Sequence, residues 1–217
     1  MLILSLDSAY SYQNFTLYES SEKKLLLHYG EDRGKKSLEL FPKIFEDLKV
    51  DINKIDLFAV NIGPGYSTSL RVGITLFKTY AQVLNKPLIT YNCYEVISLY
   101  LQKEGLFLIP LKVSRYWVYA LAKVEENRTT FLESAKILEP QKVEEIKNHF
   151  GNFEIVLPSR FQKDLDTLKE VVGNIPIKVL PLEGFSLGGT LVALQKWERK
   201  EIPNLLKVEP LYFRPPV

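Results

Sequence analysis

The order of strand and helix patterns limits the fold of this 217-residue chain more than any other feature, because that order occurs twice. Each half shows three strand patterns followed by alternating helices and strands, βββαβαβα, with Leu2 and Phe107 at corresponding starts. Strands and helices interleaved in this way form layered α/β structures. The sequence therefore predicts a duplicated α/β fold with two lobes, residues 1–104 and 105–217, and a cleft between them.

Short apolar runs indicate the strands, and apolar positions three or four residues apart indicate the helices. In the first half, strands are expected at Leu2–Leu6, Asn14–Tyr18, Lys24–Tyr29, Leu57–Ile62 and Leu88–Thr90, with helices at Leu38–Leu48, Leu70–Leu84 and Glu95–Lys103. In the second half, strands are expected at Leu106–Val113, Trp117–Lys123, Thr130–Leu138, Glu154–Leu157 and Ile177–Leu180, with helices at Val143–Phe150, Phe161–Val172 and Leu187–Arg199.

The composition argues against several classes of protein. A formal net charge of +2 gives no overall signal for nucleic-acid binding. The single Cys93 excludes an intrachain disulfide framework, and with only His28 and His149 beside it there is little material for a zinc site. The opening apolar run meets Asp7 too early for a signal peptide or a membrane span. We expect a cytoplasmic protein with no metal and no membrane contact.

The segment 63–73, GPGYSTSLRVG, is the most distinctive motif in the chain. A glycine-rich turn between a strand and a helix, with Arg71 just inside the helix, is typical of a phosphate cradle. Asp7 and Ser8 follow the first strand, where an acid could hold a hydrated metal ion and the backbone amides could meet phosphate. The alternative is that Asp7 orders its own turn through hydrogen bonds.

The corresponding position in the second half decides between a working and a remnant nucleotide site. It contains the segment 112–117, KVSRYW, which has neither a carboxylate nor a glycine. A backbone loop that closely approaches phosphate needs small residues, so an autonomous ATPase is not expected. We predict no catalytic residue and a remnant phosphate loop made of Asp7, Ser8, Gly63, Gly65, Thr68 and Arg71. Gly188 and Gly189 allow either an adenine site or tight helix packing.

The helix expected at 70–84 has two apolar stripes, although a helix that covers one sheet needs only one. One stripe contains Leu70, Ile74, Phe77, Ala81 and Leu84, and the other contains Val72, Leu76, Tyr80 and Val83. The earlier helix is similar, with Phe41 and Phe45 on one face and Leu40 and Ile44 widening it. Either the two halves of the chain bury these faces against each other, or a protein partner lies on both helices.

Three segments together resemble the TsaB family, also called YeaZ. They are the opening Ile3–Ser8, the loop Gly63–Gly65 with Thr68 before Leu70–Ile74, and the ending Glu209–Arg214. The resemblance covers the whole length, and it implies the actin-like, Hsp70-like ATPase fold, which is a duplicated ribonuclease H-like fold.

The resemblance also implies a function. TsaC makes threonylcarbamoyl-adenylate, TsaD transfers the group to the adenosine beside the anticodon of certain tRNAs, and TsaB is a non-catalytic subunit that binds TsaD through its two early helices. TsaE joins that complex. The chain is then expected to have no cofactor of its own, with ATP or ADP only where partners meet, to contact tRNA indirectly, and to use the same helices for TsaD or a homodimer. The residues implied for that interface are Leu40, Phe41, Ile44, Leu70, Arg71, Ile74, Phe77, Lys78 and Ala81.

The chain departs from the family pattern at three places, which makes it a divergent member. Tyr66–Ser69 (YSTS) stands where the family has Ser-Phe-Thr-Gly, so Tyr66 and Ser69 are departures. Lys36–Leu38 stands where the family has His-Ser-Glu, and Lys112–Ser114 where it has Asp-Ala-Arg. The alternative functions are a small-molecule kinase or ATPase, a metalloprotease, and a homodimer that acts alone. A kinase needs both phosphate loops, and a metalloprotease needs metal ligands that this chain lacks.

Overall fold

The structure is a computed structural model that describes residues 1–32, 40–126 and 128–213. Its first half contains β1 (Leu2–Asp7), β2 (Tyr12–Glu19), β3 (Lys24–Asp32), α1 (Phe41–Asp47), η2 (Ile52–Lys54), β4 (Leu57–Asn61), α2 (Ser67–Val83), β5 (Leu88–Tyr91) and α3 (Cys93–Ser98). Its second half contains β6 (Gly105–Val113), β7 (Tyr116–Glu125), β8 (Arg128–Ile137), α4 (Pro140–Phe150), β9 (Glu154–Pro158), η3 (Ser159–Asp164), α5 (Leu165–Val172), β10 (Ile177–Leu180), α6 (Ser186–Glu198) and η4 (Leu205–Lys207).

The two sheets have the same topology. The first has the order β3-β2-β1-β4-β5, and the second has the order β8-β7-β6-β9-β10. In each, the first strand pairs antiparallel with the second and parallel with the fourth, as β1 does with β2 and β4. The predicted α/β fold with a duplicated βββαβαβα order is therefore confirmed.

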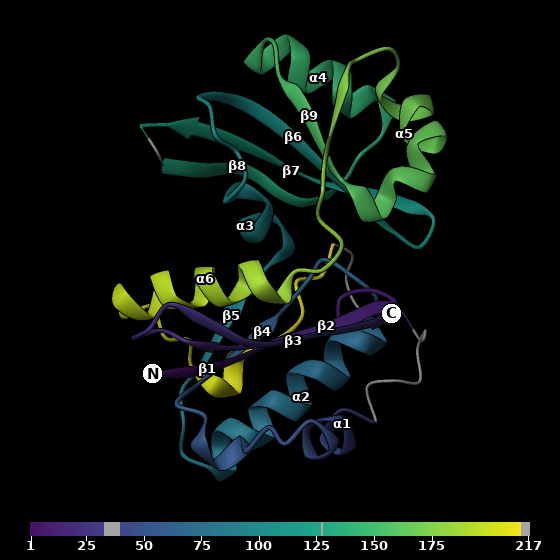
Figure 1. Cartoon of the computed structure of the whole chain (residues 1–217). Coiled ribbons are helices and arrows are strands. Elements are labelled where there is room, and N and C mark those ends of the chain that lie inside the picture. The colour runs from purple at the N-terminus through teal and green to yellow at the C-terminus, as the bar shows by residue number, and fades with distance from the viewer. Residues whose placement is uncertain (33–39, 127, 214–217) are drawn as a thin grey trace. The chain divides into compact units, whose positions relative to one another are not determined.

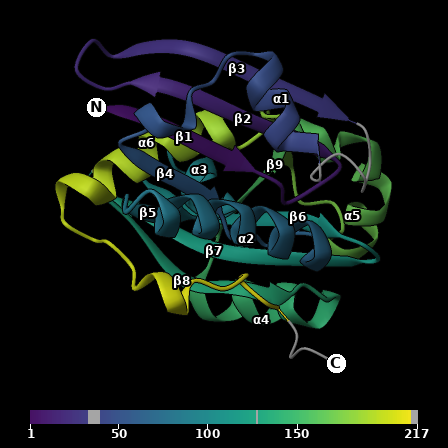
Figure 2. The ribbon, with the colours of Figure 1, turned by 90° about the horizontal axis from the view of Figure 1, so that it is seen from below.

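The first sheet is covered on both faces, with α6 on one side and α1 and α2 on the other (Figures 1 and 2). Apolar side chains of β1 and β4, among them Leu4, Leu6 and Phe58, are fully buried between these layers. Phe15 of β2 packs edge-on against Phe41 and Phe45, which holds α1 on the sheet. This core fixes the strand ends where the predicted site residues lie.

The chain forms two compact units. The first contains Met1–Val96 and Gly184–Leu211, and the second contains Ile97–Glu183 and Tyr212–Val217. This division differs from the predicted one, because α6 comes late in the sequence yet packs on the first sheet, where it contacts β1, β2, β4 and β5. The boundary near residue 97 lies within α3.

Gly188 and Gly189 explain how α6 approaches the first sheet so closely. A Cβ at Gly189 would lie 2.1 Å from the Tyr91 ring, and one at Gly188 would lie 2.4 Å from the Val96 side chain. Glycine is therefore required for packing at both positions, which supports the packing alternative.

Several helix boundaries differ from the prediction for local reasons. Pro42 lies in the first turn of α1, where a missing amide proton costs nothing, so α1 begins only at Phe41. Leu38 lies outside the described residues, as do Lys36 and Ser37. The helix expected at 161–172 is divided into η3 and α5, and α2 begins three residues before Leu70.

Candidate functional site

Asp7, at the end of β1, is fully buried and accepts hydrogen bonds from four nitrogen atoms. Its Oδ1 accepts from the amide of Ala9 at 3.0 Å and from Asn61 Nδ2 at 2.9 Å. Its Oδ2 accepts from Asn14 Nδ2 at 2.9 Å and from the amide of Phe185 at 3.0 Å. A carboxylate has about four lone-pair sites, so these donors use its whole capacity. Asp7 thus joins its own turn to β2, β4 and the start of α6.

This arrangement favours the interpretation that Asp7 orders its turn rather than holding a hydrated metal ion. Asn14 and Asn61 were not predicted as members of the site. Asn61 could have been suspected because it ends a strand parallel to β1, and such strand ends meet at one edge of a sheet. Asn14 lies opposite Asp7 on the antiparallel strand β2, a register that the sequence does not show. Asn14 also accepts from the amide of Ser186 through Oδ1 at 2.9 Å, so the same cluster caps the first turn of α6.

The Gly63–Gly65 loop is filled by the chain's own atoms. The Gly63 amide donates to Asn61 Oδ1 at 2.8 Å, and the Tyr66 amide donates to the carbonyl of Ala9 at 2.8 Å. Gly63 has φ +111°, a conformation that favours glycine. A Cβ at Gly65 would lie 2.2 Å from the Ala9 carbonyl oxygen. These two amides, which a phosphate cradle would offer to a ligand, are bonded within the protein.

Aromatic rings lie beside this loop. Tyr10 is buried. Its ring packs edge-on against Tyr66, with 5.7 Å between centroids, and lies tilted against Phe185 at 6.3 Å. At the start of α2, Gly73 lies so close to Ser8 that a Cβ would be 2.2 Å from Ser8 Oγ. The loop therefore sets α2 tightly against the end of β1. Of the predicted remnant residues, Asp7, Ser8, Gly63 and Gly65 come together here, whereas Thr68 and Arg71 are exposed on α2.

Replacing Gly65 by alanine is expected to destabilise the protein by about 1–3 kcal/mol, because the new methyl group would overlap a backbone oxygen that cannot rotate away. Urea unfolding monitored by circular dichroism measures the change. Gly30→Ala is the matched control. Its methyl group would meet the hydroxyl end of Tyr12, a side chain that can move, so it should unfold close to the wild type. Equal stability of both variants would contradict tight closure of the loop.

The corresponding turn in the second half has a different form. Val113 pairs with Tyr116, so the turn consists of Ser114 and Arg115, whereas the turn after β1 spans residues 8–11. Ser114 has φ +57°, a left-handed conformation in a tight turn. The side chains of Lys112 and Arg115 lie over the rings of Trp117 and Tyr116, with 4.8 Å and 5.0 Å to the ring centroids. This turn presents cations where a nucleotide clamp would need an acid.

Burial corrects the predicted partner interface on α1 and α2. The stripe that was expected to meet a partner faces the chain's own sheet instead. The buried members are Phe41, Leu70, Ile74, Phe77 and Ala81, each at most 3% exposed. The sequence could not show which of two equally apolar stripes turns inward. These five side chains cannot contact a partner from their places in the core.

Three members of the second stripe of α2 face outward, whereas the fourth, Tyr80, turns to the core and stacks on Phe58 with 6.0 Å between ring centroids. Val72 is 38% exposed and Val83 is 75% exposed, with half-buried Leu76 between them. Thr79 lies on the same face, and its hydroxyl donates to the carbonyl of Thr75 at 2.9 Å. We call Val72, Leu76, Thr79 and Val83 the outward stripe.

Four further residues of the predicted interface lie at or near this surface. Leu40 is 41% exposed and Ile44 is half-buried, beside the buried face of α1. Arg71 is exposed. Lys78 is half-buried, and its Nζ donates to the carbonyl of Val208 at 3.3 Å, which ties the segment after η4 to α2.

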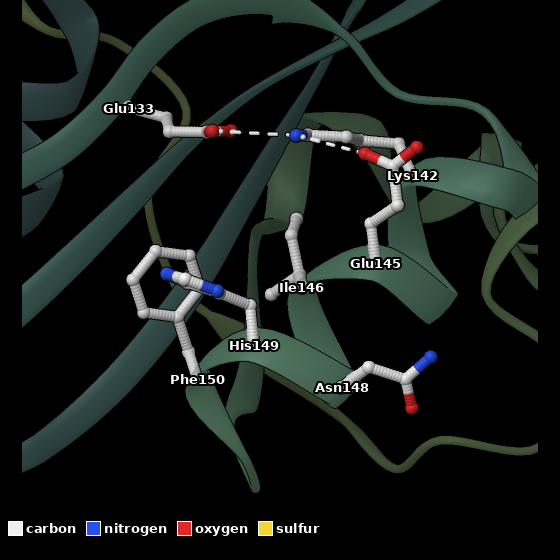
Figure 3. A pocket seen from close by; sticks show the side chains of 7 residues that line it. All are labelled: Glu133, Lys142, Glu145, Ile146, Asn148, His149 and Phe150. Carbon is white, nitrogen blue, oxygen red and sulfur yellow. Dashed lines mark hydrogen bonds and ion pairs between the residues drawn. The ribbon is translucent and has the colours of Figure 1, made fainter.

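The second unit has an open hollow of about 530 Å³ between β8 and α4 (Figure 3). Lys142 lies between two carboxylates, 3.3 Å from Glu133 and 3.2 Å from Glu145, and Lys136 also pairs with Glu133 at 3.2 Å, so two positive charges balance two negative ones. Burial opposes ionisation of Glu133, but hydrogen bonds from Tyr119, Lys136 and Lys142 outweigh it and lower its pKa. Burial, together with the bond to Glu133, raises the pKa of Tyr119. The hollow contains no predicted site residue.

No group of three or more His, Cys, Asp and Glu side chains placed to bind a metal occurs within 1–32, 40–126 and 128–213. Over the same ranges, no helix has both the length and the apolar character to cross a membrane. His28 contacts Thr16 Oγ1 through Nδ1 at 2.9 Å, and burial lowers its pKa. Cys93 is buried beneath the loop, 3.5 Å from the Pro64 carbonyl.

Fold and site together define a duplicated α/β protein whose glycine-rich loop is closed by hydrogen bonds to its own residues. Structural comparison agrees with this description. YeaZ from Pseudomonas aeruginosa superposes with a TM-score of 0.73 over 97% of this chain and 99% of that one, at 15% sequence identity. A second P. aeruginosa structure, described as similar to peptidase YeaZ, gives the same score over 98% of this chain and 99% of that one, also at 15% identity. The fold is thus shared over nearly the whole length.

Sequence comparison points to TsaD. The family model for TsaD, tRNA N6-adenosine threonylcarbamoyltransferase, matches residues 34–111. The transferase of that name from Sulfurovum sp. is 31% identical over an alignment of 123 residues that covers 49% of this chain and 36% of that protein. A probable bifunctional tRNA threonylcarbamoyladenosine biosynthesis protein from Methanocaldococcus jannaschii is 45% identical over 56 residues, 25% of this chain and 10% of that protein. The match thus spans about a third of the Sulfurovum transferase. Together with the YeaZ fold, these similarities confirm the predicted resemblance.

Proposed function

We propose that this chain is a TsaB-type subunit that pairs with a TsaD transferase and supports transfer of a threonylcarbamoyl group to tRNA, without catalysing the reaction itself. The observation that carries the proposal is the Asp7 cluster. All four acceptor positions of the acid are taken by protein donors, and the adjoining loop is closed by Ala9 and Tyr66. This strand end orders the protein and offers no acceptor to a metal–nucleotide complex.

The similarities support the pathway in two ways. The YeaZ fold extends over nearly the whole chain, and the sequence of residues 34–111 matches the family model of the transferase. A non-catalytic chain related to the transferase fits a subunit that pairs with it, because related folds can form pseudo-symmetric pairs through equivalent surfaces. The outward stripe of α2 supplies an apolar surface for such a pair, and a homodimer would compete for the same surface.

The test is reconstitution of the transfer reaction. Purified TsaD, TsaE and tRNA are supplied with threonylcarbamoyl-adenylate, and modified adenosine is measured by mass spectrometry with and without this chain. We expect modification to fall at least tenfold when the chain is left out. Adding the Asp7→Asn variant at a temperature where it remains folded should restore modification, because Asp7 has no catalytic part in the proposal.

Two results would contradict the proposal. Full modification without this chain would remove the subunit role. If this chain modified tRNA with TsaD omitted from the mixture, the chain itself would be a transferase. That is the activity for which its sequence relatives are named. TsaE and a bound nucleotide enter only as components of the assay, so omitting each in turn tests whether the complex needs them.

A further inference from the structure

A line of hydrogen bonds runs from the edge strand β3 of the first sheet to the start of α6. His28 lies opposite Thr16 in the β2–β3 pairing, and its Nδ1 is 2.9 Å from Thr16 Oγ1. Thr16 Oγ1 is in turn 2.8 Å from Oγ of Ser186, the first residue of α6. All three residues belong to the first compact unit. We call them the imidazole–hydroxyl chain.

The inner end of this chain is buried and joined to the Asp7 cluster. Thr16 and Ser186 are fully buried. The Ser186 amide donates to Asn14 Oδ1 at 2.9 Å, and Asn14 Nδ2 donates to Asp7 at 2.9 Å. The outer end, His28, is exposed on the edge strand. A change of charge at the surface is therefore linked to the contacts that hold the first turn of α6.

The two hydroxyl groups determine the direction in which the chain donates. Each has one proton to donate, and within the described residues neither hydroxyl has a hydrogen-bond partner outside the chain. Only one direction uses both protons: Ser186 donates to Thr16, and Thr16 donates to Nδ1 of His28. The imidazole is then the final acceptor, and its own proton is on Nε2.

Protonation of His28 reverses this direction. Both ring nitrogens of an imidazolium carry protons, so Nδ1 can no longer accept. Thr16 must then donate to Ser186, and the Ser186 proton loses its acceptor in a fully buried position, which destabilises the folded state. The new positive charge also lies only two hydrogen bonds from the N-terminus of α6, where the helix dipole disfavours a cation.

The titratable groups on the surrounding elements do not offset this effect. None of them forms an ion pair with His28: Glu19 pairs with the N-terminal amine, and Lys196 pairs with Glu95. Burial therefore acts alone to lower the pKa of His28 below its ordinary value of 6.5. The groups on these elements are Lys24, Tyr29, Glu31 and Asp32 on β3, Tyr12, Tyr18 and Glu19 on β2, Asp7 on β1, and Lys196 and Glu198 on α6.

We propose that the imidazole–hydroxyl chain is a pH-sensitive lock on the start of α6, closed while His28 is neutral and released when it is protonated. Because folding lowers the pKa of His28, the lock stabilises the folded state fully above the unfolded pKa of 6.5. That stabilisation is lost as the pH falls through the lower, folded pKa. The lock lies within the first unit and does not depend on the proposed subunit role.

The direction of the chain can be tested on the wild-type protein by NMR, with nitrogen-15 in its two histidines. At about pH 8, where a histidine is neutral, long-range proton–nitrogen correlations should show a proton on Nε2 of His28 and none on Nδ1. His149→Asn assigns the two sets of signals. A proton on Nδ1 of neutral His28 would overturn the proposal, because the chain would already run in the direction of the protonated state.

The lock itself is tested by hydrogen exchange at the amides of Phe185 and Ser186. One linked proton changes an opening equilibrium by at most about tenfold per pH unit, so between about pH 7.5 and 5.5 we expect wild-type opening to rise roughly three- to tenfold, after correction for intrinsic exchange. His28→Asn should remove this rise, because its Oδ1 replaces the Nδ1 acceptor and cannot be protonated. Thr16→Val should also remove it, because it breaks the chain in the middle.

His149→Asn is the matched control, because it replaces the other histidine, which is exposed in the last turn of α4 in the second unit. It should keep the wild-type response to pH. Circular dichroism at neutral pH checks that each variant is folded. A wild-type response in His28→Asn, or an equal loss of the response in His149→Asn, would refute the lock. Reconstitution at neutral pH tests the subunit role separately, so either proposal can fail without the other.

Discussion

Replacing Asp7 by alanine is expected to lower the free energy of unfolding by about 3–5 kcal/mol, because it removes the acceptor for four buried donors at once. The Phe185 amide and both asparagine side chains would remain buried without this partner. The start of α6 would loosen from β1 and β2. Urea unfolding gives the change in stability, and hydrogen exchange at the first turn of α6 shows whether the loss is located there.

Asp51→Ala is the matched control for this variant. Asp51 is an exposed aspartate that accepts hydrogen bonds from the amide and the side chain of Asn53 and pairs with exposed Lys54, and its loss should cost about 1 kcal/mol. ATP hydrolysis by wild type and Asp7→Ala should be equally low. If Asp7→Ala unfolded like the wild type but abolished a measurable ATPase activity, Asp7 would belong to a nucleotide site after all.

The fold could be predicted because its signals are local. The repeated βββαβαβα order follows from apolar periods of two and about 3.6, and these periods are visible in single segments. The Asp7 cluster could not be resolved in that way. Its donors come from residues 9, 14, 61 and 185, and only the folded sheet brings them to one carboxylate. The local sequence around Asp7 is compatible both with a metal ligand and with a structural hydrogen-bond acceptor, so it could not distinguish the two roles.

The interface on α2 shows a second limit of prediction from sequence. Leu70, Ile74 and Phe77 form a stripe as apolar as the one that contains Val72 and Val83. Which stripe meets the sheet depends on how the folded chain seats α2, where Gly73 packs so close to Ser8 that a Cβ would lie 2.2 Å from Ser8 Oγ.

The buried and outward stripes of α2 should respond in opposite ways to a negative charge. Phe77→Asp is expected to unfold the protein, because it places an unpaired carboxylate at a fully buried position and leaves a cavity, at a cost of several kcal/mol. Val72→Asp/Val83→Asp should leave the melting temperature within a few degrees of the wild type, since both side chains already reach solvent. The same double variant should weaken binding to TsaD about 100-fold, because the interface would have to bury two unpaired charges.

Co-purification and isothermal titration calorimetry with TsaD measure this loss, and circular dichroism separates it from unfolding. Leu132→Asp on β8 is the matched control. Leu132 is 40% exposed, a fraction similar to the 38% of Val72, but it belongs to the other unit. Wild-type affinity of Val72→Asp/Val83→Asp would exclude the outward stripe as the docking surface. A folded Phe77→Asp variant that fails to bind TsaD would contradict the burial of the first stripe as well. Phe77 could then not be part of the core, and the first stripe would be the interface.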